Sequence, residues 1–194
     1  MPNPISFIII LLVSTFTPGP NNILSMSRAA QVGFSRSFRL NLGMFVGFIT
    51  IQGLITAFNF YLVQILPVLK PVLMVAGAAY ILWLAYTIAF GNSKKKAPVQ
   101  SNAGTFLMGF LLQFVNPKLY IFALTMISTF ITPYYSDVPR LIGFVLLMSL
   151  TGFIATCAWG LFGSVFKKLF TDHEVVLNRI LAILLAGSAI SLFL

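Results

Sequence analysis

The stretch FTPGPNNILSMSR, residues 16–28, decides how the fold of this chain is read. It interrupts an apolar run with a glycine between two prolines, and two amides follow. These residues are Pro18, Gly19, Pro20, Asn21 and Asn22. A proline inside a helix removes an amide donor and clashes with the carbonyl four residues back, so several backbone groups lose their partners here. In lipid such groups are tolerated only where they are buried in protein or line a wet cavity. The stretch therefore predicts a broken membrane helix with a polar break.

The composition places this break in a membrane protein. Hydrophobic residues make up 59% of the 194 residues and charged residues 8%, against roughly 45–50% and 25% in soluble domains. Six apolar runs are each about 20 residues or longer, enough to cross a hydrocarbon core of about 30 Å. They cover 4–27, 41–64, 68–90, 105–130, 139–164 and 176–194. No basic residue precedes the first run, so we interpret it as a retained helix rather than a secretory signal peptide. We expect an all-α integral membrane protein with six transmembrane helices in a single domain, 1–194.

The positions of the charges predict the topology. The net charge is +9, and the basic residues gather in alternate loops between the apolar runs. They are Arg28, Arg36 and Arg39, then Lys94, Lys95 and Lys96, then Lys167, Lys168 and Arg179. The positive-inside rule makes these three loops cytoplasmic and puts both termini on the outer side. The lysine run is interpreted as an anchor on anionic lipid, and no nucleic-acid partner is expected because no basic groove with interleaved aromatics accompanies it.

The chain also shows signs of two related halves. The polar stretch 91–104 is predicted to be a cytoplasmic linker between repeat 1, about 1–90, and repeat 2, about 105–194. FTPGPN at 16–21 corresponds to FVNPK at 114–118, and an Arg-Leu pair opens the next span in each half. Paired breaks in the opening helix of each half are typical of inverted-repeat transporters. We therefore expect two inverted three-helix repeats with broken helices 1 and 4. Chance similarity between apolar segments is the alternative.

The two breaks together suggest a site for a zwitterion. A half-helix restarting at Asn21 would direct its partially positive N-terminus at the break, which suits a carboxylate. Lys118 adds a full positive charge inside a span, and intramembrane lysines are costly and usually functional. Freed carbonyls and amide oxygens suit the ammonium of an amino acid. The candidate substrate-binding residues are Thr17, Pro18, Gly19, Pro20, Asn21, Asn22, Asn116, Pro117 and Lys118.

Three blocks of sequence carry a resemblance to a known family. TPGPNN at 17–22, QFVNPK at 113–118 and six hydrophobic runs in a chain of this length resemble the LysE/RhtB family of amino-acid exporters. The wording of TPGPNNIL, AGAAYILWLA at 76–85 and LQFVN is most similar to its cysteine and O-acetylserine efflux proteins. The resemblance implies a secondary transporter of the bacterial inner membrane that exports small neutral amino acids, with no cofactor, driven by the proton gradient. It places the family's signature residues on Pro18, Pro20, Pro117, Asn21, Asn22 and Asn116.

Proton coupling has few candidate groups in this sequence. The three acidic residues and the one histidine fall in predicted loops; they are Asp137, Asp172, Glu174 and His173. Proton relays in membranes usually use carboxylates or histidines within the spans. Coupling could run through Lys118, through a titrating substrate, or be absent.

Two other functions are less compatible with the residues. A divalent-cation exporter would need carboxylates, thiolates or imidazoles in the membrane. Cys157 is the only such group in a predicted span, and we interpret it as a small buried residue, so no metal site is expected. A membrane enzyme is not expected either, because the spans hold no nucleophile and base at matching spacing. Five amides either line the substrate path or bridge helices: Asn41, Gln52, Asn59, Gln64 and Gln113. A homo-oligomer remains open.

Overall fold

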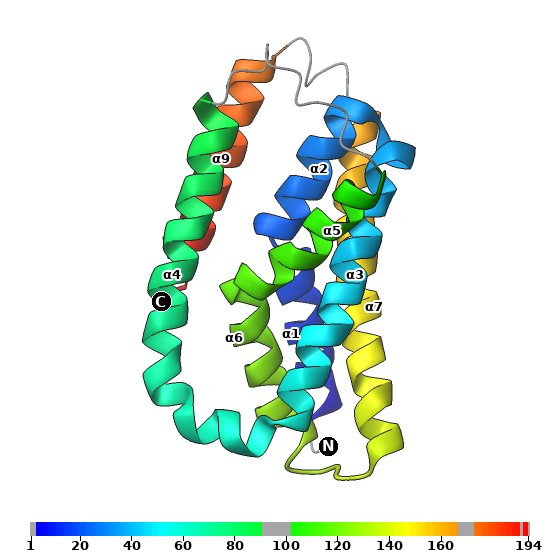
Figure 1. Ribbon diagram of the computed structural model, residues 1–194, viewed down its shortest axis with the longest axis vertical. Coiled ribbons are helices and arrows are strands. Elements are labelled where there is room, and N and C mark those ends of the chain that lie inside the picture. The colour runs from blue at the N-terminus through cyan, green and yellow to red at the C-terminus, as the bar shows by residue number, and fades with distance from the viewer. Residues whose placement is uncertain (1–2, 91–101, 167–172, 191, 194) are drawn as a thin grey trace.

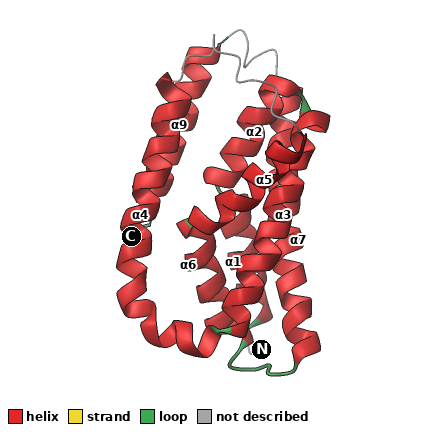
Figure 2. Cartoon of the chain, in the orientation of Figure 1, coloured by secondary structure: helices red, strands yellow, loops and turns green. Residues whose placement is uncertain are grey.

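The computed structural model describes residues 3–90, 102–166, 173–190 and 192–193, and the described residues form helices joined by short turns (Figure 1, Figure 2). In the first half these are α1 Pro4–Phe16, α2 Pro20–Val32, α3 Phe34–Ala57 and α4 Asn59–Phe90. In the second half they are α5 Asn102–Leu112, a 3₁₀ turn η1 Gln113–Val115, α6 Pro117–Met126, a π-helix η2 Ile127–Ile131, α7 Val138–Val165 and α9 Glu174–Ile190. The all-α prediction is confirmed for these residues.

Local signals in the sequence explain several helix ends. Asn3 Oδ1 accepts from the Ser6 amide at 3.0 Å, and Asp137 Oδ1 accepts from the Arg140 amide at 3.1 Å, so α1 and α7 each begin at a side-chain cap. Gly33 separates α2 from α3 with a φ of 87°, a backbone conformation that other residues rarely adopt. The chain can therefore reverse direction between these two helices in a single residue.

Both predicted helix breaks are present. The axes of α1 and α2 differ by 44°, and the axis of Thr105–Val115 differs by 62° from that of Pro117–Ile131. Each break is short, because no more than four residues separate the two helices of a pair. Each pair is apolar and long enough to form one bent span.

Two straight helices, α3 and α7, are long and apolar enough to cross a membrane, and the bent pairs raise the number to four within the described residues. Two further apolar segments, Met74–Phe90 of α4 and Val175–Ile190 of α9, are shorter. Large apolar side chains are exposed on the outside of the bundle, including Ile5, Val72, Trp83, Ile154 and Ile183. Such a surface suits lipid. Six spans in two inverted repeats remain a prediction.

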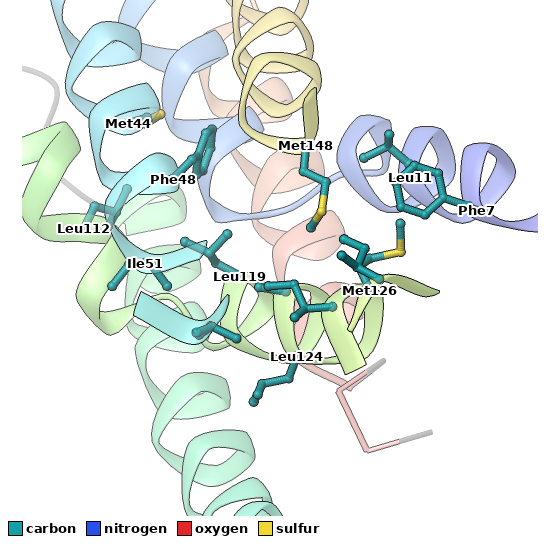
Figure 3. Packing of buried hydrophobic residues seen from close by; sticks show 14 of the residues in the cluster. Phe7, Leu11, Met44, Phe48, Ile51, Leu112, Leu119, Leu124, Met126 and Met148 are labelled. Carbon is teal, nitrogen blue, oxygen red and sulfur yellow. The ribbon is translucent and has the colours of Figure 1, made fainter. Parts of the chain in front are cut away.

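The helices form two packed groups (Figure 1). In one, α3 lies between α5 and α7, and α2 packs on α7; in the other, α4 runs beside α9. Close approach in the first group depends on glycines, since a Cβ at Gly43 would overlap the carbonyl of Phe106 on α5 and one at Gly109 the carbonyl of Leu40 on α3. The larger cluster of buried apolar side chains comes from α1, α3, α5, α6, η2 and α7 (Figure 3).

Some predicted boundaries are wrong. The second and third runs were expected to separate at about 65–67, but α3 ends at Ala57 and α4 is one helix from Asn59 to Phe90. Figure 1 shows that the first part of α4 bends strongly. Pro67 and Pro71 lie in this part of the sequence, and prolines usually kink a membrane helix without ending it because nearby groups re-pair the freed carbonyls. Helix α3 also starts before its apolar run, since helices continue past the hydrocarbon core.

Part of the predicted cytoplasmic surface lies outside the described residues. This applies to residues 91–101 of the expected linker 91–104, whereas 102–104 belong to α5. It applies also to the basic residues Lys94, Lys95, Lys96, Lys167 and Lys168.

Candidate functional site

The first break has the geometry that its residues favour. Helix α1 ends at Phe16, and Gly19 is extended, with φ −169° and ψ 174°, before α2 starts at Pro20. Proline suits the first position of a helix because the amide it lacks would have no partner inside the helix. The break therefore frees carbonyls at the end of α1, and these need other donors.

Side chains supply those donors. Asn22 Nδ2 donates to the carbonyl of Thr15 at 2.8 Å and to that of Thr17 at 2.9 Å. Two donors come from other helices: Trp159 Nε1 to the Phe16 carbonyl at 3.1 Å and Ser188 Oγ to the Pro18 carbonyl at 3.4 Å. In an apolar surrounding each unmade bond would cost on the order of several kcal/mol. Asn22 thus fixes the shape of the break with its amide nitrogen.

The second break has a similar construction. Helix α5 is followed by the tighter 3₁₀ turn η1. Asn116, with φ −89° and ψ 99°, occupies the N-cap position of α6, which starts at Pro117. Asn116 is 2% exposed, and its Oδ1 has no hydrogen-bond partner among the described residues. A buried amide oxygen without a partner is costly. This atom is therefore a ready acceptor for a ligand.

The second residue of each restarted half-helix reaches the other break. Asn21 Nδ2 donates to Gln113 Oε1 at 2.9 Å, and Gln113 Nε2 donates back to Asn21 Oδ1 at 3.1 Å. Lys118 Nζ donates to Thr17 Oγ1 at 3.0 Å. The two breaks, nearly a hundred residues apart in sequence, thus meet as one polar junction.

Lys118 has only neutral partners in this junction. Its ammonium lies 3.4 Å from the carbonyls of Thr17 and Pro18, in addition to the Thr17 hydroxyl. Among the described residues an ion pair joins Arg140 Nε and Asp137 Oδ2 at 3.2 Å, and it does not involve Lys118. The side chain of Lys118 passes closely over Gly19, where an added Cβ would lie 3.0 Å from Nζ. A partly buried cation without a carboxylate is a favourable position for an anionic ligand.

A cavity of about 60 Å³ lies at the junction. Six of the nine predicted site residues line it: Gly19, Pro20, Asn21, Asn22, Asn116 and Lys118. Thr17, Pro18 and Pro117 do not line it and instead shape the breaks. Eight further lining residues were not predicted: Ser14, Thr15, Phe48, Leu119, Phe122, Met148, Gly152 and Thr156.

A second cavity, of about 230 Å³, lies next to the first and is lined mainly by α1 and α6. The two share Ser14, Lys118 and Phe122, so Lys118 lines both cavities. The other side chains of the second cavity are Ile10, Ile121, Thr125, Met126 and Leu192.

Comparison with known proteins identifies the family. Residues 12–194 match the family model described as LysE type translocator. The chain belongs to the LysE family. It is 37% identical over 182 residues to the cysteine/O-acetylserine efflux proteins of Escherichia coli K12 and of Shigella flexneri, which covers 94% of this chain and 93% of each relative. No solved structure matches the chain.

Membership in the LysE family makes this chain a multi-pass membrane transporter rather than an enzyme. The family resemblance of the motifs at 17–22 and 113–118 is confirmed. The same motifs supply both sides of the polar junction.

Three of the five amides left open by the sequence bridge helices in this LysE family member. Ser25 Oγ donates to Asn41 Oδ1 at 2.8 Å, Ser149 Oγ to Gln52 Oε1 at 3.4 Å, and Asn59 Nδ2 to Thr132 Oγ1 at 2.9 Å. Gln113 belongs to the junction instead. None of these four amides lines the cavity at the junction, so they hold helices in place. Cys157 is half-buried, with Asn41 Nδ2 3.7 Å from its Sγ.

Proposed function

We propose that this LysE family member exports small neutral amino acids from the cytoplasm, with cysteine and O-acetylserine as substrates. The observation that carries the proposal is Lys118, a partly buried cation with neutral partners beside a small cavity. A carboxylate is the ligand such a cation favours. The curated relatives are named for efflux of cysteine and O-acetylserine, and their identity to this chain extends over nearly its whole length.

The junction offers complementary groups to both charges of an amino acid. The carboxylate would lie between Lys118 and the first turn of α2, where helix dipole and ammonium act together. The substrate's ammonium would donate to Asn116 Oδ1, the buried oxygen that lacks a partner. Asn21 and the oxygen of Asn22 complete the polar lining. Thr17, Pro18 and Pro117 would act by shaping the two breaks.

We also propose six spans arranged as two inverted repeats in one domain, in the bacterial inner membrane. Pro20 and Pro117 each begin a half-helix, and the next residue of each half-helix reaches across to the other break. This exchange of contacts is what a two-fold relation between the halves would produce. With the basic loops cytoplasmic, both termini lie outside. A C-terminal reporter that is active only in the cytoplasm should stay dark; a signal would contradict this topology.

Proton coupling of amino-acid export and the alternative function, export of a divalent cation, depend on different residues. Lys118 is the proposed coupling group. It lines both cavities, and no other described residue along their walls has a charged side chain that can titrate. A divalent-cation exporter of the same superfamily has no support from the described residues, where no three His, Cys, Asp or Glu side chains cluster.

Counterflow in proteoliposomes tests the export proposal. Vesicles loaded with cysteine, O-acetylserine or other neutral amino acids should take up labelled cysteine or O-acetylserine, and an imposed pH gradient should change the rate. The uptake should be lost in Asn22→Ala and Pro117→Ala, which disturb the two breaks. Folded protein that exchanges no amino acid would overturn the substrate proposal, and metal ions would then be tested.

A further inference from the structure

Part of the cavity has an apolar wall, and the export proposal gives its residues no role. The charged and amide groups that line the cavity come from the starts of α2 and α6 and from the cap before α6. The apolar wall comes from three helices: Phe48 of α3, Leu119 and Phe122 of α6, and Met148 of α7, with Gly152 of α7. Figure 3 shows Phe48, Leu119 and Met148 near one another in the buried cluster.

Met148 and Gly152 act as one surface. They are four residues apart on α7 and so lie on the same face, one turn from each other. Met148 is completely buried and Phe48 is 5% exposed, so both side chains are held by packing rather than by lipid. A Cβ at Gly152 would lie 3.1 Å from Phe48 Cε2 and 3.3 Å from Cδ2. The glycine therefore lets the ring of Phe48 pack directly against α7, and a larger residue at 152 would push the ring away from α7.

The polar and apolar parts of the cavity would contact different parts of an amino acid: the polar part its carboxylate and ammonium, the apolar part its side chain. Every amino acid presents the same carboxylate and ammonium, so the polar junction cannot distinguish one from another. Discrimination must come from contacts with the side chain. A thioether and an aromatic ring form a polarizable apolar surface that suits a thiol or a short ester. The cavity of about 60 Å³ is small, and pockets for larger ligands start at roughly 300 Å³.

We propose that Met148 and Gly152, facing Phe48, form the side-chain subsite that sets how long a substrate side chain can be. The inference rests on the proposed amino-acid export. Met148 forms the end of the subsite and Gly152 its floor. A shorter residue at 148 lengthens the subsite, and a larger one at 152 shortens it. The two substitutions therefore change selectivity in opposite directions, which a general loss of structure cannot do.

The test is competition counterflow with amino acids of graded length. Unlabelled alanine, cysteine, O-acetylserine, methionine and norleucine compete with labelled cysteine in the wild type, in Met148→Ala and in Gly152→Ala. Met148→Ala should strengthen inhibition by methionine and norleucine relative to cysteine by about tenfold, the discrimination that one methylene gives in a hydrophobic pocket. Gly152→Ala should weaken inhibition by O-acetylserine relative to alanine by a similar factor.

Two controls separate selectivity from folding. Met44→Ala removes an equally buried methionine from α3 that lines neither cavity. Gly143→Ala adds a methyl to α7 where no atom lies within 4 Å. Both should leave the order of competitors unchanged. Equal effects of Met148→Ala and Gly152→Ala on all competitors, or the same effects in the controls, would overturn the subsite.

A readout that does not need transport distinguishes the two proposals. The thermal stability of the purified protein in detergent is measured with each amino acid of the panel. Stabilisation that follows side-chain length and changes oppositely in the two variants supports the subsite even if exchange fails, and exchange failure would then count against export alone. A wild type that neither exchanges nor is stabilised by any member of the panel overturns both.

Discussion

The ammonium of Lys118 lies 3.0 Å from the hydroxyl oxygen of Thr17, although the two residues are 101 positions apart in the sequence. This contact joins α6, the helix that restarts after the second break, to Thr17, the residue that caps the end of α1 before the first break. Together with the paired amides of Asn21 and Gln113 it closes a junction of two broken helices. We expect these contacts to determine whether the substrate binds at the junction and is transported.

Lys118→Met should abolish amino-acid exchange. Methionine keeps the length of the side chain but removes the charge that we propose for the substrate carboxylate, and charged hydrogen bonds contribute about 1.5–3 kcal/mol, or roughly 10- to 100-fold in affinity. The response to an imposed pH gradient should disappear with it. Both are measured by counterflow.

Lys118→Arg is the matched control, since it keeps the charge in a different geometry and should retain part of the exchange. Thermal stability of Lys118→Met should change little, because removal of a partly buried charge without an ionic partner offsets the loss of its hydrogen bonds to Thr17 and Pro18. Exchange and pH response that both survive in Lys118→Met would contradict the role of this residue.

The amide pair between Asn21 and Gln113 should contribute measurably to stability. Asn21→Ala leaves Gln113 without its partner across the junction, although Gln113 Nε2 keeps a 3.0 Å bond to the Gly109 carbonyl. A double-mutant cycle with Gln113→Ala should give a coupling energy of about 0.6 kcal/mol and at most about 1.7 kcal/mol, the average and the maximum for hydrogen bonds between membrane helices. Unfolding in mixed detergent checks it, and a coupling energy of zero would show that the two amides act independently.

The breaks were predictable because proline and glycine act locally, but the apolar wall was not. Phe48 and Leu54 are both apolar residues of α3, yet Phe48 is 5% exposed and Leu54 is 47% exposed. In a helix of a soluble protein, the exposed position would usually carry a polar residue, so the sequence would distinguish the exposed position from the buried one. In a membrane helix lipid accepts apolar side chains as readily as the core does, so the periodicity is weak. The partners of Asn21 and Lys118 were equally hidden, because they depend on how distant helices meet.

The stability of the protein should depend strongly on the side-chain amide nitrogen of Asn22. Its Nδ2 serves the carbonyls of Thr15 and Thr17 at once. Asn22→Ala should lower the unfolding free energy by about 2 kcal/mol, from two bonds at about 1 kcal/mol each, and should abolish exchange. Asn22→Asp keeps the shape but not the donors, and should show the same loss. Unchanged stability in Asn22→Asp would mean that water or another donor replaces the amide.

Gly77→Ala should disturb the second break from α4, a helix that packs on α6. A Cβ at Gly77 of α4 would overlap the ring of Pro117, the residue that starts α6. Overpacking of this kind costs about 1–3 kcal/mol, more than the gain of up to about 1 kcal/mol that alanine brings to a helix. Because α6 carries Lys118, exchange should fall along with thermal stability. Gly143→Ala, in open space on α7, is the control and should be neutral or slightly stabilising. If both variants behave alike, α4 does not support the break through this contact.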